Sequence, residues 1–181
     1  MPYFLAIVAF AFAFAMPASA QDFSAFREGP VFTEFGAVAE IEPDQPLPAN
    51  MHFMHSFDVA KGAGEDGMNR GIESAARFVN MMVLHGVPRE NIHVAVVVHG
   101  AASLDLLDRE AFATRFDGRD NLTAAPLADM MEVGIEVYLC GQSATAHGIA
   151  KADLVPGVKM AVSAMTAHAL LQQRGYTVNP F

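Results

Sequence analysis

Residues 133–144 read Val-Gly-Ile-Glu-Val-Tyr-Leu-Cys-Gly-Gln-Ser-Ala, and this stretch decides the fold and locates the candidate site. Residues 135–139 mix β-branched, aromatic and aliphatic side chains, which predicts a strand that enters a core. Cys140 follows this strand directly, and the small residues 144–148 predict the start of a helix with Ser143 as its N-cap. A thiol between a strand end and a helix start meets backbone N–H groups, which favour the thiolate.

Cys140 is the only cysteine of the chain, so the protein cannot form an intramolecular disulfide. In an oxidising compartment such a thiol is free, paired between molecules or modified. It is either a reactive group or a small buried hydrophobic side chain, and its position at a strand end favours the reactive group.

The first twenty residues have the composition of a secretory signal peptide. Residues 3–15 are apolar and uncharged, and residues 18–20 (Ala-Ser-Ala) have the small side chains of a cleavage site. The apolar run is short for a membrane span and no Lys or Arg precedes it, so an uncleaved N-terminal anchor is the alternative. We expect cleavage before Gln21, a periplasmic or secreted protein, and no membrane attachment after cleavage.

The rest of the chain divides into an N-terminal arm, residues 21–50, and one domain, residues 51–181. The domain is long enough to bury a core of its own. Pro and Gly interrupt the arm, and its short apolar pieces at 31–32 and 38–41 predict at most edge strands or a hairpin. The phenylalanines of the arm indicate that it covers the core or contacts another subunit.

The charge of the chain argues against one class of partner. The formal net charge is −9, and residues 1–20 contribute none of it. Contacts to the phosphates of nucleic acids need clusters of Lys and Arg, which this acidic sequence lacks. We therefore expect no nucleic-acid partner.

Strand and helix patterns alternate through the domain. Strands are expected at residues 51–59, 91–99, 135–139, 158–162 and 176–178. Helices are expected at residues 70–85, 103–117, 125–132 and 164–174. The run 94–98 is wholly apolar, which is typical of a strand covered on both faces. The alternation predicts an α/β domain of three layers with a mostly parallel sheet of about five strands.

Three polar residues, Asp58, His99 and Cys140, stand at the carboxyl ends of predicted strands. Ligands of open α/β sheets bind at this edge, so we expect the three side chains to lie close together. Two alternatives remain open: Asp58 caps the Gly-rich loop that follows it, and His99 is an ordinary strand-end histidine.

Two polar residues follow the cysteine. Gln142 binds either a ligand or its own turn, and His147 faces either the thiol or solvent. Cys140 and nearby histidines are also ligand types for copper or zinc, but no C-x-x-C or H-x-x-x-H spacing supports a metal site. We expect neither a metal nor another cofactor.

The sequence resembles the DsrE/DsrF-like sulfur-relay family, especially its small exported members. The matching pieces are Phe57-Asp58, Asn69-Arg-Gly-Ile72, Val96-Val-Val-His99-Gly-Ala-Ala102, Gly134-Ile-Glu-Val-Tyr-Leu-Cys140-Gly-Gln142, Leu154-Val-Pro-Gly-Val158 and the tail from Ala161 to Tyr176. The resemblance covers residues 50–181.

The resemblance implies a parallel α/β sheet, a homo-oligomer (trimer or hexamer), and a cysteine at position 140 that carries or transfers sulfur as a persulfide. The partner is then a small sulfur donor or an acceptor thiol. His99 would favour the thiolate or the persulfide anion, and the backbone N–H groups after the cysteine would stabilise its charge.

From the residues and the resemblance together, we name candidates for the site. The candidate catalytic residues are Cys140 and His99, and the candidate substrate-binding residues are Asp58, Gln142, Gly141, Asn69 and His147. The alternative is a non-catalytic oligomeric module that binds a small ligand or a metal in the same pocket. A structural subunit of a larger assembly is a third possibility.

Overall fold

The computed structural model describes residues 22–48 and 50–179, so the signal peptide predicted at residues 1–20 lies outside the described residues. A single sheet of five parallel strands has the order β4-β3-β2-β1-β5. Its strands are β1 (Phe53–Val59), β2 (Ile92–Val98), β3 (Glu136–Cys140), β4 (Lys159–Ala161) and β5 (Thr177–Asn179). The α-helices are α1 (Arg70–Leu84), α2 (Arg109–Arg115), α3 (Ala124–Glu132), α4 (Gly141–His147) and α5 (Ala164–Gln173). The 3-10 helices are η1 (Arg89–Asn91), η2 (Gly100–Leu106) and η3 (Lys151–Asp153). The predicted α/β class and parallel sheet are therefore confirmed.

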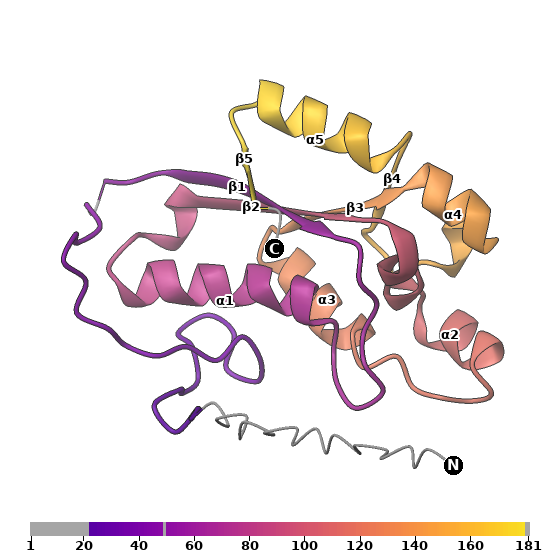
Figure 1. Cartoon of the computed structure of the whole chain (residues 1–181), viewed down its shortest axis with the longest axis horizontal. Helices are drawn as coiled ribbons and strands as arrows, with labels where there is room; N and C mark the ends of the chain where they lie inside the picture. Colours follow the sequence, from indigo (N-terminus) through magenta and orange to yellow (C-terminus); the bar gives the residue numbers. More distant parts are fainter. Residues whose placement is uncertain (1–21, 49, 180–181) are drawn as a thin grey trace, which may run out of the picture.

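The strand order explains the three layers. From β1 to β4 the chain moves across the sheet in one direction, and it then returns to place β5 on the other side of β1. Parallel connections are right-handed, so a reversal of direction moves the connecting helix to the opposite face. Accordingly α1 and α3 lie on one face of the sheet and α5 lies on the other (Figure 1).

The sequence pattern fixes the central strands and the first helix. All residues of β2 except His93 are buried, as expected for a strand covered on both faces. The side chain of Asn69 caps α1 by accepting hydrogen bonds from the N–H groups of Gly71 and Ile72. The helix ends before Gly86, whose positive φ of 88° is easily adopted by glycine.

One helix was predicted too long. The segment 103–117 is not continuous, because Leu107 adopts an extended conformation and pairs with Leu154 in an isolated bridge. Asp108 then starts α2 as an N-cap by accepting a hydrogen bond from the N–H of Ala111. Asp108 therefore separates η2 from α2, although apolar residues on both sides of it in the sequence suggested one continuous helix.

The described part of the N-terminal arm packs on α1. The buried side chain of Asn80 on α1 binds the backbone of the arm at Val31, Phe32 and Gly36. Within residues 22–48 the arm forms only the single bridge between Arg27 and Val38, so the pieces at 31–32 and 38–41 form neither edge strands nor a hairpin with each other. Among the described residues, no helix is both long and apolar enough to span a membrane.

Candidate functional site

Cys140 is the last residue of β3, and α4 begins at the next residue. Our prediction of Ser143 as the N-cap was therefore wrong, because Cys140 itself occupies the cap position. The turn is tight: a Cβ atom at Gly141 would lie 2.6 Å from the carbonyl oxygen of Ala161 on the neighbouring strand. Glycine at position 141 thus lets the helix start close behind the thiol.

The Cys140 thiol is nearly buried, with 6% of the residue exposed. Burial raises the pKa of the thiol, but hydrogen bonds from the N–H and hydroxyl of Ser143 and from the N–H groups of Ala164 and Gln142 outweigh it. The net result is a pKa below the ordinary value. The thiolate is therefore favoured by the groups around it, as the position in the sequence predicted.

Ser143 links the thiol to the end of β2. Its hydroxyl oxygen accepts a hydrogen bond of 3.0 Å from the N–H of Gly100, and the hydroxyl contributes to the lowered pKa of Cys140. A hydroxyl that accepts from a backbone N–H is polarised and becomes a better donor to the sulfur. We had assigned Ser143 only a capping role, because a sequence pattern cannot show contact with residue 100.

Asp58 lies between two histidines. The Nε2 of His99 is 3.1 Å from one carboxylate oxygen of Asp58, and the Nε2 of His168 is 2.8 Å from the other. Burial raises the pKa of Asp58, but the two imidazoles lower it more, so the pKa lies below its usual value. Asp58 is thus an ionised acceptor that orients both rings.

These groups line one small cavity of about 260 Å³ at the carboxyl edge of the sheet. Its lining residues are Asp58, His99, Cys140, Gln142, Ser143, Ser163, Ala164, Met165 and His168. The structure therefore brings Asp58, His99 and Cys140 together, as their strand-end positions predicted. His99 directs its Nε2 to Asp58, and the contacts described above that favour the thiolate come from other residues.

His168 is a residue of this cavity that sequence reasoning missed. It lies on α5, and its side chain is 15% exposed. Its second ring nitrogen, Nδ1, is buried without a hydrogen-bond partner among the described residues. The available signal was a histidine within the otherwise apolar stretch 167–171, but nothing in the sequence shows that α5 crosses above the ends of β1 and β3.

The remaining predicted residues are Gln142, which also lines this cavity, and Asn69 and His147, which do not. The side chain of Gln142 is turned to the carbonyl of Val162 at 3.2 Å. The side chain of Asn69 is buried and bonded to Lys61 and Asp105, so its role here is to fix the loop after β1. His147 lies in the last turn of α4 and is absent from the lining of the Cys140 cavity. Among the described residues, no group of three or more His, Cys, Asp or Glu is arranged to hold a metal ion.

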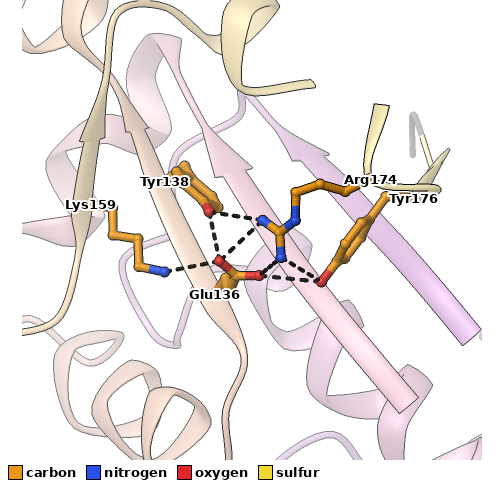
Figure 2. A network of polar contacts seen from close by, with 5 residues as sticks. All are labelled: Glu136, Tyr138, Lys159, Arg174 and Tyr176. Carbon is orange, nitrogen blue, oxygen red and sulfur yellow. Dashed lines mark hydrogen bonds and ion pairs between the residues drawn. The ribbon is translucent and has the colours of Figure 1, made fainter. Parts of the chain in front are cut away.

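A polar network holds the helix that covers the thiol. Glu136, at the start of β3, accepts hydrogen bonds from Arg174 at 2.6 Å and from Tyr138 at 2.6 Å. Lys159 and the hydroxyl of Tyr176 complete the network, at 2.9 and 3.2 Å (Figure 2). Arg174 directly follows α5, so the network fixes the far end of this helix while its first residues face Cys140.

Comparison with known proteins agrees with this architecture. Among solved structures, the chain is similar to MTH1491 from Methanobacterium thermoautotrophicum, a protein of unknown function. The identity is 17% and the TM-score 0.50, over 70% of this chain and 96% of that one. It is also similar to the ychN protein from E. coli, with 16% identity and a TM-score of 0.50, over 70% of this chain and 98% of that one. At such identities the similarity shows the fold alone. No curated protein matches the chain.

The fold and the site define a class of protein: a parallel α/β domain with a cysteine at the carboxyl edge of its sheet. The family model for the DsrE/DsrF-like family matches residues 54–180, and the chain belongs to that family. At the level of the family, this membership suggests a function in sulfur relay.

Proposed function

We propose that the protein carries or transfers sulfane sulfur as a persulfide on Cys140. The observation that supports this most directly is a thiol that is nearly buried and yet has a lowered pKa. Burial alone has the opposite effect, so the hydrogen-bond donors around the sulfur are arranged for an anion. A thiolate and a persulfide anion are both such anions.

The proposed reaction needs one thiol on this chain. The Cys140 thiolate attacks the outer sulfur of a donor, the donor's sulfur–sulfur bond breaks, and the donor thiolate leaves with the electron pair. An acceptor thiol then attacks the same outer sulfur and releases Cys140 as a thiolate. The partners are accordingly a small sulfur donor and an acceptor thiol, and the reaction requires no bound cofactor.

His99 and His168, which both contact Asp58, would act on the sulfur donor and its outer sulfur rather than on Sγ of Cys140. His99 and His168 line the cavity into which an added sulfur would extend, and Asp58 holds their Nε2 atoms. In this step His99 would carry a proton on both ring nitrogens: the Nε2–H stays on Asp58, and the Nδ1 proton passes to the departing donor thiolate. His99 is therefore the proposed acid, and His168, on α5, is the second imidazole that contacts Asp58.

The test is to weigh the intact mature protein after incubation with polysulfide, thiosulfate or glutathione persulfide. We expect a mass gain of whole sulfur atoms that dithiothreitol reverses. Cys140→Ser, which lacks the thiol but keeps a similar shape, should gain none. A wild-type protein that gains no sulfur from any of the three donors would contradict the proposal, and the non-catalytic ligand-binding module would then be the better explanation.

Export and oligomerisation belong to the same proposal. We propose cleavage before Gln21 and a periplasmic or secreted location, which Edman sequencing of protein recovered from the periplasmic fraction would test. We also propose a homotrimer or hexamer. Beside the outer strand β4, Val162 and Leu170 line a cavity of about 560 Å³ and expose 73% and 57% of their surfaces, and Met165 nearby in sequence exposes 80%. A second copy of the chain would bury these apolar side chains, and light scattering with Leu170→Glu as the disruptive variant tests it.

A further inference from the structure

A second cavity lies beside the Cys140 site, and its basic side chains indicate an anionic ligand. The cavity has a volume of about 580 Å³ and lies between the loop after β1 and the first residues of α1. Lys61 and Arg70 are the basic residues of its lining. Asp58 lines both this cavity and the cavity of Cys140, so the two spaces are neighbours.

Lys61 and Arg70 are available to a ligand. Both residues are exposed, and within the described part of the chain neither side chain forms an ion pair or a hydrogen bond. Most of the other Lys and Arg side chains contact a carboxylate, a backbone carbonyl or an aromatic ring. The protein as a whole has a net charge of −9, so two unpaired cationic side chains beside one cavity form a locally positive site.

The buried side chain of Asn69 holds the two cationic residues in place. Its Nδ2 donates to the carbonyl oxygen of Lys61 at 2.8 Å, and its Oδ1 accepts from the N–H groups of Gly71 and Ile72. The loop is thereby tied to the start of α1 next to Arg70. Because Asn69 occupies these N–H groups, a bound anion would be held by the two side chains and not by the helix terminus.

Asp58 is the acidic residue in the lining of this cavity. Its two carboxylate oxygens are directed to the imidazoles of His99 and His168. The carboxylate is therefore directed to the Cys140 side of the cavity, where the two imidazoles lie. The lining thus presents a cationic end at Lys61 and Arg70, and Asp58 marks its border with the cavity of the two histidines and the thiol.

The distance to the thiol limits the size of the ligand. Val59 pairs with Val98, and Val98 pairs with Leu139, so the residue after Val59 is level with Cys140 two strands away. Adjacent strands are about 4.8 Å apart, which places this end of β1 about 10 Å from the end of β3. An extended tripeptide also spans about 10 Å. Thiosulfate is too short to bridge the two places.

We propose that this cavity binds the carboxylate end of a peptide-sized persulfide, of which glutathione persulfide is the type, while its outer sulfur reaches Cys140. The inference rests on the proposed persulfide chemistry and adds the class of donor. The outer sulfur forms a bond to Sγ of Cys140, the sulfur–sulfur bond of the donor breaks, and the peptide leaves as a thiolate that takes up a proton. One persulfide is consumed and one is formed, so the step needs no oxidant or reductant.

The experiment compares wild type with Lys61→Ala/Arg70→Ala and with a matched control, Arg109→Ala/Lys151→Ala. The control removes the same two residue types from exposed positions outside the cavity lining. Each protein is incubated with glutathione persulfide, with N-acetylcysteamine persulfide, which has no carboxylate, and with inorganic polysulfide. The sulfur gain of Cys140 is followed against time by intact-protein mass spectrometry, and thermal unfolding by circular dichroism verifies that each variant is folded. If the alanine variant is unfolded, Lys61→Gln/Arg70→Gln repeats the test with the side-chain stems kept.

We expect the Lys61/Arg70 variant to need about tenfold more glutathione persulfide for half its maximal rate, the loss expected for two exposed charge contacts. Its rates with the persulfide that lacks a carboxylate and with polysulfide should equal those of wild type, because neither donor has the carboxylate end that the cavity would hold. Added salt should weaken the preference of wild type for the anionic donor. Calorimetry with the unreactive S-methylglutathione should show the same tenfold loss of affinity.

The outcomes separate this inference from the proposed function. Equal dependence on glutathione persulfide in all three proteins would overturn the anion site, while loading of Cys140 by polysulfide would leave the proposed function intact. Binding of S-methylglutathione that depends on Lys61 and Arg70, without sulfur gain from any donor, would support the site and refute sulfur transfer.

Discussion

The network around Glu136 gives the sharpest quantitative prediction. Burial raises the pKa of Glu136, but hydrogen bonds from Arg174, Tyr138 and Lys159 lower it from 4.5 to about 2 (Figure 2). A lowered pKa means that the ionised carboxylate stabilises the folded state. This contribution is complete well above pH 4.5, and it is lost progressively as the pH falls towards 2.

The magnitude follows from the shift in pKa. A lowering of about 2.5 units corresponds to about 3.4 kcal/mol at neutral pH. Arg174 and Lys159 keep about half of their side-chain surface exposed, 48% and 53%, so solvent screens their attraction. We therefore discount the free energy to about 2 kcal/mol.

Glu136→Gln should lower the free energy of unfolding by about 2 kcal/mol near neutral pH, because the amide keeps the shape of the side chain and loses its charge. The difference from wild type should shrink from about pH 5 downwards and be small near pH 2, where the carboxylate of the folded protein is half protonated. Urea unfolding followed by far-ultraviolet circular dichroism, at several pH values between 7 and 2, measures this difference.

The matched control is Glu132→Gln, at an exposed residue at the end of α3. It should change the unfolding free energy by less than about 0.5 kcal/mol at every pH. A Glu136→Gln difference that stays constant across the pH range would refute the electrostatic reasoning, because a loss of packing does not titrate.

Two further predictions concern the surroundings of the thiol. Ser143→Ala should raise the pKa of Cys140, because the hydroxyl that helps to stabilise the thiolate is lost; the pH profile of the alkylation rate with iodoacetamide measures it, and an unchanged profile would exclude a role for the hydroxyl. Gly141→Ala should destabilise the fold by about 1–3 kcal/mol, since its Cβ would lie 2.6 Å from the carbonyl oxygen of Ala161. Gly67→Ala is the control, because a Cβ there has no atom within 4 Å, and equal melting temperatures of the two variants would contradict the steric argument.

The sequence predicted the elements of this fold better than their contacts. Strands β1 to β5 lie within two residues of their predicted ranges, because a buried strand leaves a periodic or continuous apolar pattern in the chain itself. The alternation of strands and helices predicted the parallel sheet. In such a sheet the carboxyl ends of the strands meet at one edge, where Asp58, His99 and Cys140 were expected. The break between η2 and α2 was missed because its cause, the bridge from Leu107 to Leu154, joins distant segments.

The missed parts of the site have the same physical origin. His168 and Ser143 are identified by what they touch, and those partners are separated from them by 110 and 43 residues. An apolar pattern reports which face of a helix is buried, but it does not report which strand ends lie beneath that face. The site could therefore be located from the strands, whereas the groups contributed by α5 and by the start of α4 required the structure.

The hydrogen-bond donors around Cys140 do not include His99 or His168, so the two histidines have a separate role in the proposed chemistry. The N–H groups of Gln142, Ser143 and Ala164 act on Sγ of Cys140, so they stabilise the thiolate before any sulfur arrives. If Cys140 carries sulfur as proposed, the negative charge moves outward by one bond, onto an atom that these donors do not surround. The cavity then presents His99 and His168 to that atom, both held by Asp58. The Nε2 of His168 is the nitrogen that Asp58 holds, while its Nδ1 is buried without a hydrogen-bond partner in the described structure. The free thiolate and the loaded persulfide would thus meet different groups, the first the backbone N–H groups at the starts of α4 and α5 and the second the imidazoles that line the cavity.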